Sequence, residues 1–247
     1  MHLSTRRKSV RLVASVASIA TVGVVMVGAP VFADEVPTEE PTSTPSAPPV
    51  EPCLTSVPKV RKKYWSKVPT GTKQVVLVEG RSMKSYSSKV VRWEKRGKCW
   101  FKLSTFDAYN GYRGWAIVPW TGGQRSPIGT YRLTDAGGRL ANPGTKMRYH
   151  YGPQAYGAGG YAMSRAKLQI FDYVVAVNYN RKAGTTPRAN KVLTRKKASG
   201  YWFHVRRAFP TRGCVSMSRP NMKTFTRWLD PSKKPVTIQG PRTTIYS

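Results

Sequence analysis

The sequence predicts a mainly β fold with one or two short helices, and two observations carry this prediction. From residue 74 onward, short runs rich in Val, Trp, Tyr and Ile recur, and clusters of Gly and Ser separate them. Only one stretch, which follows Met217, repeats apolar residues at helical spacing. A chain of 247 residues is long enough for one large domain or two small ones.

The expected strands are short and follow one another along the chain. β-branched and aromatic residues favour extended structure, and Gly, Pro and Ser at the ends of each run favour turns. We therefore expect strands over residues 74–78, 90–94, 99–103, 114–118, 126–133, 173–179, 201–205 and 235–238. The runs at 173–179 and 201–205 are almost entirely apolar, as in central strands.

The expected helix follows the last cysteine of the chain. Ser218 can cap its amino terminus, and Pro220 fits its first turn. Pro231 ends it, because proline cannot continue a helix. Its apolar face consists of Met222, Phe225 and Leu229.

Residues 149–161, YHYGPQAYGAGGY, follow neither the strand nor the helix period. This stretch is rich in Gly and Tyr, so it is either an ordinary surface loop or a flap whose tyrosines stack on a substrate. His150 lies within it, and we expect a structural or solvent-exposed histidine there rather than a catalytic one.

Residues 1–33 have the features of a secretory signal peptide. The positive region consists of Arg6, Arg7, Lys8 and Arg11. An apolar run over 12–27 follows it, and a small-residue cleavage site lies at 31–33. An uncleaved membrane anchor is the alternative. Residues 34–57 are a Pro/Thr/Glu-rich expected linker, and residues 58–247 are the expected catalytic domain, outside the cytoplasm.

The formal net charge of +31 comes from 42 basic and 11 acidic residues. Four of the basic residues lie in 1–33 and five of the acidic ones lie in 34–57, which leaves 38 basic and 6 acidic residues. This excess indicates an anionic partner, which can be nucleic acid, acidic lipid or a cell-wall polymer. The sequence contains no zinc-finger spacing or basic heptad pattern, so we expect no specific nucleic-acid recognition.

Three cysteines in an exported chain favour one disulfide and one free thiol. Cys53 opens the folded part and Cys99 lies in a strand-like run, so a bond between them would leave Cys214 free. The competing bond between Cys99 and Cys214 would remove the thiol. A thiol kept free outside the cytoplasm favours a catalytic use of Cys214.

Residues 201–217, YWFHVRRAFPTRGCVSM, hold His204 and Cys214 ten residues apart with a turn signal between them. An adjacent imidazole can accept the thiol proton and lower the cysteine pKa, which makes the sulfur a nucleophile. Gly213 leaves room for backbone amides to face an oxyanion. Arg212 adds a positive charge for the thiolate or for a substrate carboxylate.

Other chemistry fits this sequence less well. The alternative for this stretch is a structural cysteine and an unrelated core histidine. The six acidic residues of the folded part show no spacing typical of an acid/base pair. Three histidines in the whole chain, one of them in the expected signal peptide, argue against a metal site, and no cofactor is expected.

The residues around His204 and Cys214 resemble the L,D-transpeptidase catalytic domain, also called the YkuD domain. The pattern F-H-V…P-T-x-G-C-V-S-x of an actinobacterial branch is present at 203–205 and 210–217. Many family members instead have the pattern [ST]-H-G-C-x-[NR] around the nucleophile. In this chain Arg212 stands where that pattern has its histidine, and Ser216 stands where it has Asn or Arg. Supporting segments within about 68–239 are SPIGTY at 126–131, NPG at 142–144, VNYNR at 177–181 and RWLDP at 227–231.

The resemblance implies a YkuD-like β-sandwich with a groove that acts on peptidoglycan stem peptides. Cys214 would attack the carbonyl of an L-centred diamino acid, expel the terminal D-residue, and pass the thioester to an amine of another stem. His204 would act as base and then as acid, with a backbone carbonyl on its other nitrogen. The oxyanion and the substrate would be bound by Thr211, Arg212, Gly213 and Ser216.

The same resemblance implies a secreted protein of the cell wall, active in wall biogenesis and cell shape among anionic wall polymers. Contact with a membrane is expected only through the leader, if it is uncleaved. Two alternatives remain at the sequence level. One is an L,D-carboxypeptidase or endopeptidase that uses the same site with water. The other is a cationic wall-binding protein without catalysis.

Overall fold

The computed structural model describes residues 53–57, 59–156, 168–189, 192–194 and 197–247. Contacts group the chain from Pro49 to Ser247 into one compact unit. The expected signal peptide, most of the expected linker and residues 157–161 of the expected flap lie outside the described residues. Among the described helices, none combines the length and apolar character needed to cross a membrane.

Strands dominate the described part of the chain, so the predicted mainly β class is confirmed. The strands are β1 (Gln74–Gly80), β2 (Ser87–Arg96), β3 (Cys99–Tyr109), β4 (Trp115–Ala116), β5 (Ser126–Pro127), β6 (Gly129–Gly138), β7 (Arg148–Tyr151), β8 (Val174–Val177), β9 (Trp202–Val205), β10 (Val215–Met217) and β11 (Val236–Pro241). The helices are α1 (Lys62–Trp65), α3 (Arg219–Trp228) and α4 (Arg242–Ile245), with 3-10 turns η1 (Gln169–Phe171), η2 (Pro187–Ala189) and η3 (Pro231–Lys233).

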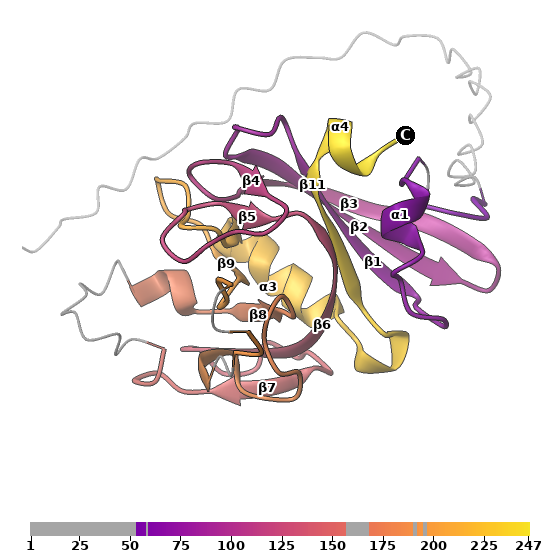
Figure 1. Ribbon diagram of the computed structural model, residues 1–247. Helices are drawn as coiled ribbons and strands as arrows, with labels where there is room; N and C mark the ends of the chain where they lie inside the picture. Colours follow the sequence, from indigo (N-terminus) through magenta and orange to yellow (C-terminus); the bar gives the residue numbers. More distant parts are fainter. Residues whose placement is uncertain (1–52, 58, 157–167, 190–191, 195–196) are drawn as a thin grey trace, which may run out of the picture. The chain divides into compact units, whose positions relative to one another are not determined.

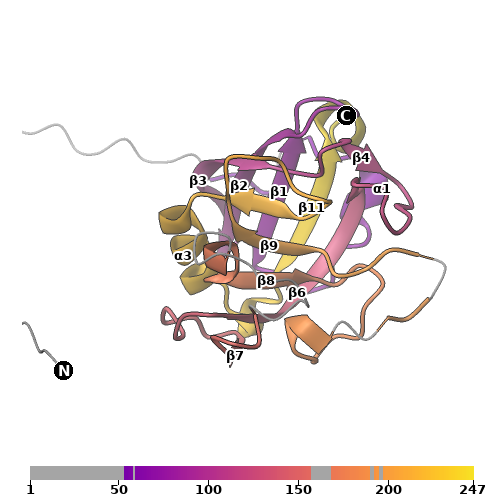
Figure 2. The same ribbon diagram turned by 90° about the vertical axis from the view of Figure 1, so that its left-hand side faces the viewer.

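The main sheet closes on itself. Its strand order is β11-β1-β2-β3-β10-β9-β8-β6-β7, and an additional pairing of β6 with β11 joins the two ends of an eight-stranded ring (Figures 1 and 2). The first part of β6 pairs with β11 at Gly129–Arg132, and its later part pairs with β8 and β7. Closure satisfies backbone groups that an open sheet would leave at its edges.

The expected helix after the cysteine is present as α3. Ser218 caps it by accepting a hydrogen bond from the Asn221 amide at 3.4 Å. Met222 and Phe225 on its apolar face are fully buried. The Phe225 ring packs on Phe203 of β9 with 4.9 Å between ring centroids, so α3 covers one face of the β9–β10 pair.

Several elements differ from the expected ones. The strands β7 and β10 lie outside the expected strand ranges, and β7 takes up residues 149–151 of the stretch that was expected to be a loop or flap. The strand expected at 114–118 is reduced to β4, because Ile117 and Val118 turn into solvent with 74% and 56% of their surface exposed. The helices α1 and α4 were not expected, since four residues each are too short to show a helical period.

A disulfide joins Cys53 to Cys99, the pairing that the sequence favoured, with 4.9 Å between the Cα atoms. The adjacent Leu54 carbonyl accepts a hydrogen bond from the Trp100 amide at 2.7 Å. Val57 is buried, with 4% of its surface exposed. Residues 53–57, the last part of the expected linker, therefore pack against β3 and the core.

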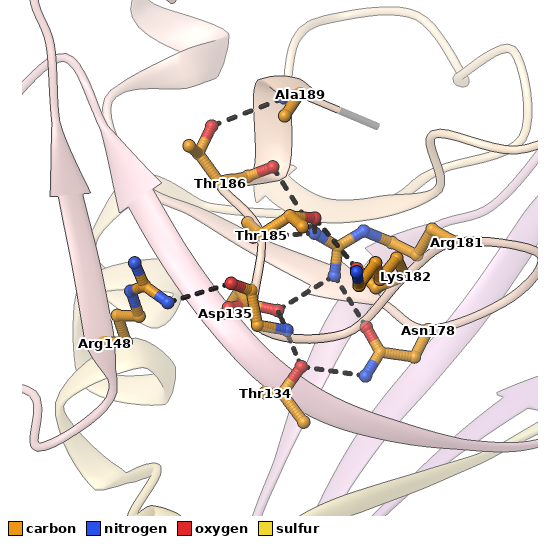
Figure 3. A network of polar contacts seen from close by, with 10 residues as sticks. Thr134, Asp135, Arg148, Asn178, Arg181, Lys182, Thr185, Thr186 and Ala189 are labelled. Carbon is orange, nitrogen blue, oxygen red and sulfur yellow. Dashed lines mark hydrogen bonds and ion pairs between the residues drawn. The ribbon is translucent and has the colours of Figure 1, made fainter. Parts of the chain in front are cut away.

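A buried polar network fixes the loop after β8 (Figure 3). Arg181 and Asp135 form an ion pair at 3.0 Å, and both side chains are fully buried. Arg181 also donates to Asn178 at 2.7 Å and to the Thr185 carbonyl at 2.8 Å. The Gly184 amide donates to the same Asp135 oxygen at 3.0 Å. Buried charges need such partners, and here they tie β6 to the loop at 178–186.

Candidate active site

The parallel pairing of β9 with β10 brings the histidine and the cysteine to one cavity. Ser216 lies directly beside His204, and Val215 lies beside Phe203. Cys214 comes immediately before β10, and it lines the same cavity as His204. The Trp202 amide donates to the Cys214 sulfur at 3.4 Å, which places the thiol at the end of β9.

Two cavities meet at this thiol. A cavity of about 440 Å³ is lined by Cys214 and His204 together with Trp202, Phe171 and Phe209. A second cavity of about 360 Å³ is lined by Cys214, Trp120, Thr121, Ser199 and Tyr201. Gly200 and Arg212 line both cavities, so Cys214 stands at their boundary. The thiol is half-buried and is free, as the cysteine count favoured.

Thr211 holds the turn that carries the cysteine. Its hydroxyl donates to the Cys214 carbonyl at 2.5 Å and accepts from the Gly213 amide at 3.0 Å. The Gly213 amide, which was expected to face an oxyanion, is therefore already bonded within the turn. Thr211 also lines the larger cavity.

Gly213 is required by the space around it and by its backbone conformation. Its φ is +133°, and a Cβ would lie 2.6 Å from the Tyr201 ring and 2.9 Å from the Arg125 carbonyl oxygen. Its carbonyl accepts from the buried Ser126 hydroxyl at 2.7 Å, and that hydroxyl also accepts from the Gly111 amide at 2.9 Å. Ser126, the first residue of the segment at 126–131, thus holds the cysteine turn through a hydrogen bond to the Gly213 carbonyl.

The orientation of the His204 ring is set by its own strand. Nδ1 lies 2.8 Å from the Val205 carbonyl oxygen. A carbonyl can only accept, so Nδ1 carries the proton and Nε2 keeps a free lone pair. The expected carbonyl partner of the second nitrogen is thus present.

Burial disfavours the charged form of both groups, and so opposes the lowering of the cysteine pKa that an adjacent imidazole can give. Burial raises the pKa of the Cys214 thiol to about 11, and the hydrogen bond from Trp202 offsets this only in part. Burial also lowers the pKa of His204 to about 4, against an opposing effect of the Val205 carbonyl. An apolar wall disfavours both charged forms, which favours proton transfer in step with the attack of the sulfur.

The other predicted residues differ in their access to the cavities. Arg212 is exposed and borders both. Ser216 is fully buried beside His204 and lines neither cavity, and its hydroxyl has no hydrogen-bond partner among the described residues. His150 lies on β7 and lines a separate cavity of about 450 Å³, away from Cys214. Its pKa is lowered, first by burial and then by Arg148.

Several residues of the site were missed at the sequence level. Trp202 alternates with His204 on one strand face, a signal that period two could have supplied. Phe171 packs on the rings of both Trp202 and His204 with centroid separations of 5.7 Å and 6.3 Å. No local pattern identifies Phe171 or Trp120, because both reach the site through tertiary packing.

Comparison with known proteins gives one family match. A family model for the YkuD L,D-transpeptidase catalytic domain matches residues 33–238. No curated protein sequence gives a significant match. The solved structures that are similar include the helical cell shape determining protein Pgp2 from Campylobacter jejuni, at 18% identity and a TM-score of 0.40, with 71% of this chain and 50% of that chain covered. Bd1075 from Bdellovibrio bacteriovorus gives 17% identity and a TM-score of 0.38, with coverage of 76% and 53%. This chain thus spans about half the length of either protein.

Proposed function

Because the chain belongs to the YkuD family of L,D-transpeptidase catalytic domains, we propose that it is a cysteine-dependent L,D-transpeptidase of peptidoglycan stem peptides. The family's function lies in peptidoglycan, which fits an extracytoplasmic location. The observation that carries the proposal is the free Cys214 at the boundary of two cavities, one of which also holds His204. Transfer between two peptides needs one nucleophile that two substrates can reach in turn.

The acylation half-reaction begins from the neutral pair. His204 Nε2 takes the proton from Cys214 Sγ as the sulfur attacks the carbonyl carbon of the donor stem. The carbonyl oxygen becomes an oxyanion, for which the Cys214 amide is the candidate donor, because the Gly213 amide is bonded to Thr211. The bond from carbon to the terminal D-residue nitrogen then breaks, and His204 returns the proton to that leaving amine.

The deacylation half-reaction repeats these steps in reverse with a different amine. The amine of a second stem attacks the thioester carbon and gives its proton to His204. The bond between carbon and sulfur breaks, and the proton returns from His204 to Cys214 Sγ. In place of the amine, water would give an L,D-carboxypeptidase or endopeptidase on the same site.

Arg212 supports recognition of an acidic substrate. It is exposed, borders both cavities and forms no ion pair within the described residues. Arg207 lines the larger cavity and is also exposed. Stem peptides end in a carboxylate, and a guanidinium binds a carboxylate with two parallel hydrogen bonds. Assignment of the chain to an actinobacterial branch stays a prediction.

Mass analysis of the products from a tetrapeptide stem, with and without an acceptor amine, tests the proposal. We expect a cross-linked product that requires the acceptor, and a carbapenem adduct on Cys214 that is absent from Cys214→Ala. A trimmed stem alone would identify a hydrolase on the same site. Retained wall binding without adduct or product would identify a non-catalytic binding protein.

A further inference from the structure

An exposed apolar surface borders the catalytic cavities. Between β3 and β5, four side chains are exposed by 58% (Tyr112), 74% (Ile117), 56% (Val118) and 61% (Trp120). Phe209, which lines the larger cavity, is 73% exposed. Single exposed apolar residues are common, but four within nine residues of one loop indicate an interaction surface. We name these five residues the mouth patch.

The mouth patch is continuous with the active site. The Tyr112 amide donates to the Thr211 carbonyl at 2.8 Å, which joins the loop after β3 to the cysteine turn. A bridge between Gly111 and Thr211 also holds the loop after β3 beside the loop that leads into β10. Trp120 lines the smaller cavity and Phe209 lines the larger one. Whatever binds this surface therefore lies next to Cys214.

The loop that carries most of the mouth patch is held in place by the fold. Trp115 is fully buried, and its amide donates to the Met83 carbonyl at 3.0 Å. Its own carbonyl accepts from Arg125 at 3.2 Å. The Pro119 carbonyl accepts from the Ala198 amide at 3.2 Å. The apolar side chains are thus presented outward by an anchored loop.

The two chain segments that carry the mouth patch hold basic residues and no acidic ones. The sequence has no Asp or Glu over 108–134 or over 173–229, which contain three and thirteen Lys or Arg residues. Arg113, Arg207 and Arg212 are exposed, and none of them forms an ion pair within the described residues. An occupant of this surface must therefore be apolar at its centre and anionic around it.

We propose that the mouth patch docks the folded domain on an anionic phospholipid bilayer. Ile117 and Val118 offer no hydrogen-bond donor to a wall polymer, but they gain free energy from insertion among acyl chains. Trp120 and Tyr112 suit the boundary between headgroups and hydrocarbon. The arginines around them attract headgroup phosphates. The catalytic cavities then open at the membrane surface.

Hydrogen exchange of the full chain, read by mass spectrometry on single peptides, tests this docking. We expect vesicles of phosphatidylcholine and phosphatidylglycerol to slow exchange over residues 112–121, and vesicles of phosphatidylcholine alone to have a much weaker effect. This local readout separates the loop from the apolar residues 12–27, which can insert by themselves. It is also independent of Cys214 chemistry.

The decisive variant is Ile117→Ser with Val118→Ser, because neither side chain lines a cavity. We expect the lipid concentration for half-maximal protection to rise by about tenfold or more. Carbapenem labelling of Cys214 should be unchanged. The control is Tyr151→Ser, which removes a side chain on β7 whose exposure, 61%, lies between those of Ile117 and Val118. Tyr151 pairs with Gly138, about 30 Å along β6 from Gly129 at its start.

Three outcomes would overturn the proposal. The first is an absence of protection over 112–121 with anionic vesicles. The second is protection that the double variant retains in full. The third is equal protection by inorganic polyphosphate alone, which would make this surface a site for soluble polyanions rather than for a bilayer.

Discussion

Replacing Thr211 by valine isolates the hydroxyl that holds the cysteine turn. Valine keeps the shape of the side chain and removes both hydrogen bonds, the one to the Cys214 carbonyl at 2.5 Å and the one from the Gly213 amide at 3.0 Å. An unpaired buried backbone group costs about 1–3 kcal/mol, and the half-buried site admits water to part of it. We therefore expect the free energy of unfolding to fall by about 1–3 kcal/mol in total.

The same change should slow the chemistry of Cys214. A displacement of about 1 Å at a reacting atom can cost about 100-fold in rate, so we expect carbapenem acylation to slow by about 10- to 100-fold. Urea denaturation and intact-protein mass spectrometry over time give the two quantities. Thr211→Ser keeps the hydroxyl and should lie within about 0.5 kcal/mol of the parent. Equal or faster acylation of Thr211→Val would refute a positioning role for the hydroxyl.

Three further predictions concern a buried histidine, a buried ion pair and the disulfide. The pKa of His204 is lowered to about 4 from an ordinary 6.5. Its contribution to the free energy of unfolding is therefore complete above pH 6.5, and about 3 kcal/mol of it is lost as the pH falls toward 4. Urea denaturation at several pH values in that range should show this fall in stability, and His204→Gln should reduce it. Asp135→Ala should destabilise the fold by about 3–5 kcal/mol, because it leaves the Arg181 charge buried and unpaired; a loss below about 1 kcal/mol by the same assay would contradict the importance of this pair. Replacing both cysteines of the Cys53–Cys99 bond by serine should cost about 4 kcal/mol, since the bond closes a loop of 46 residues, while carbapenem labelling of Cys214 continues.

Local patterns were sufficient for most of the fold. Runs of β-branched residues identified β1, β2 and β8, and a cap, a proline and an apolar stripe identified α3. The sequence did not predict that β4 is only two residues long. Ile117 and Val118 are β-branched, as strand residues often are, although both side chains are exposed. The closure of the ring through β6 and β11 could not be predicted either, because it joins strands about 100 residues apart.

The site was predictable where one segment carries it. His204 lies on β9 and Cys214 comes immediately before β10, the strand paired with β9, so one motif holds both residues. The directions of the pKa shifts were not visible in the motif, because burial opposes the charged form of both groups and depends on residues outside the motif, such as Phe171 against His204. The occupied Gly213 amide was missed for a similar reason. The Thr211 hydroxyl, two residues before Gly213, accepts the hydrogen bond of this amide, and the sequence pattern does not show that bond.

The disulfide at the start of the described chain has a mechanical consequence. Tension on the residues before Cys53 would enter the fold through the Cys53–Cys99 bond, at the first residue of β3. β3 meets β10 only at its opposite end, where Ala108 and Tyr109 pair with Met217 and Ser216. A pulling force would thus be borne by the long β2–β3 ladder, ten residues away from the turn that holds the reactive sulfur. The domain could stay tethered under load without distorting its catalytic turn.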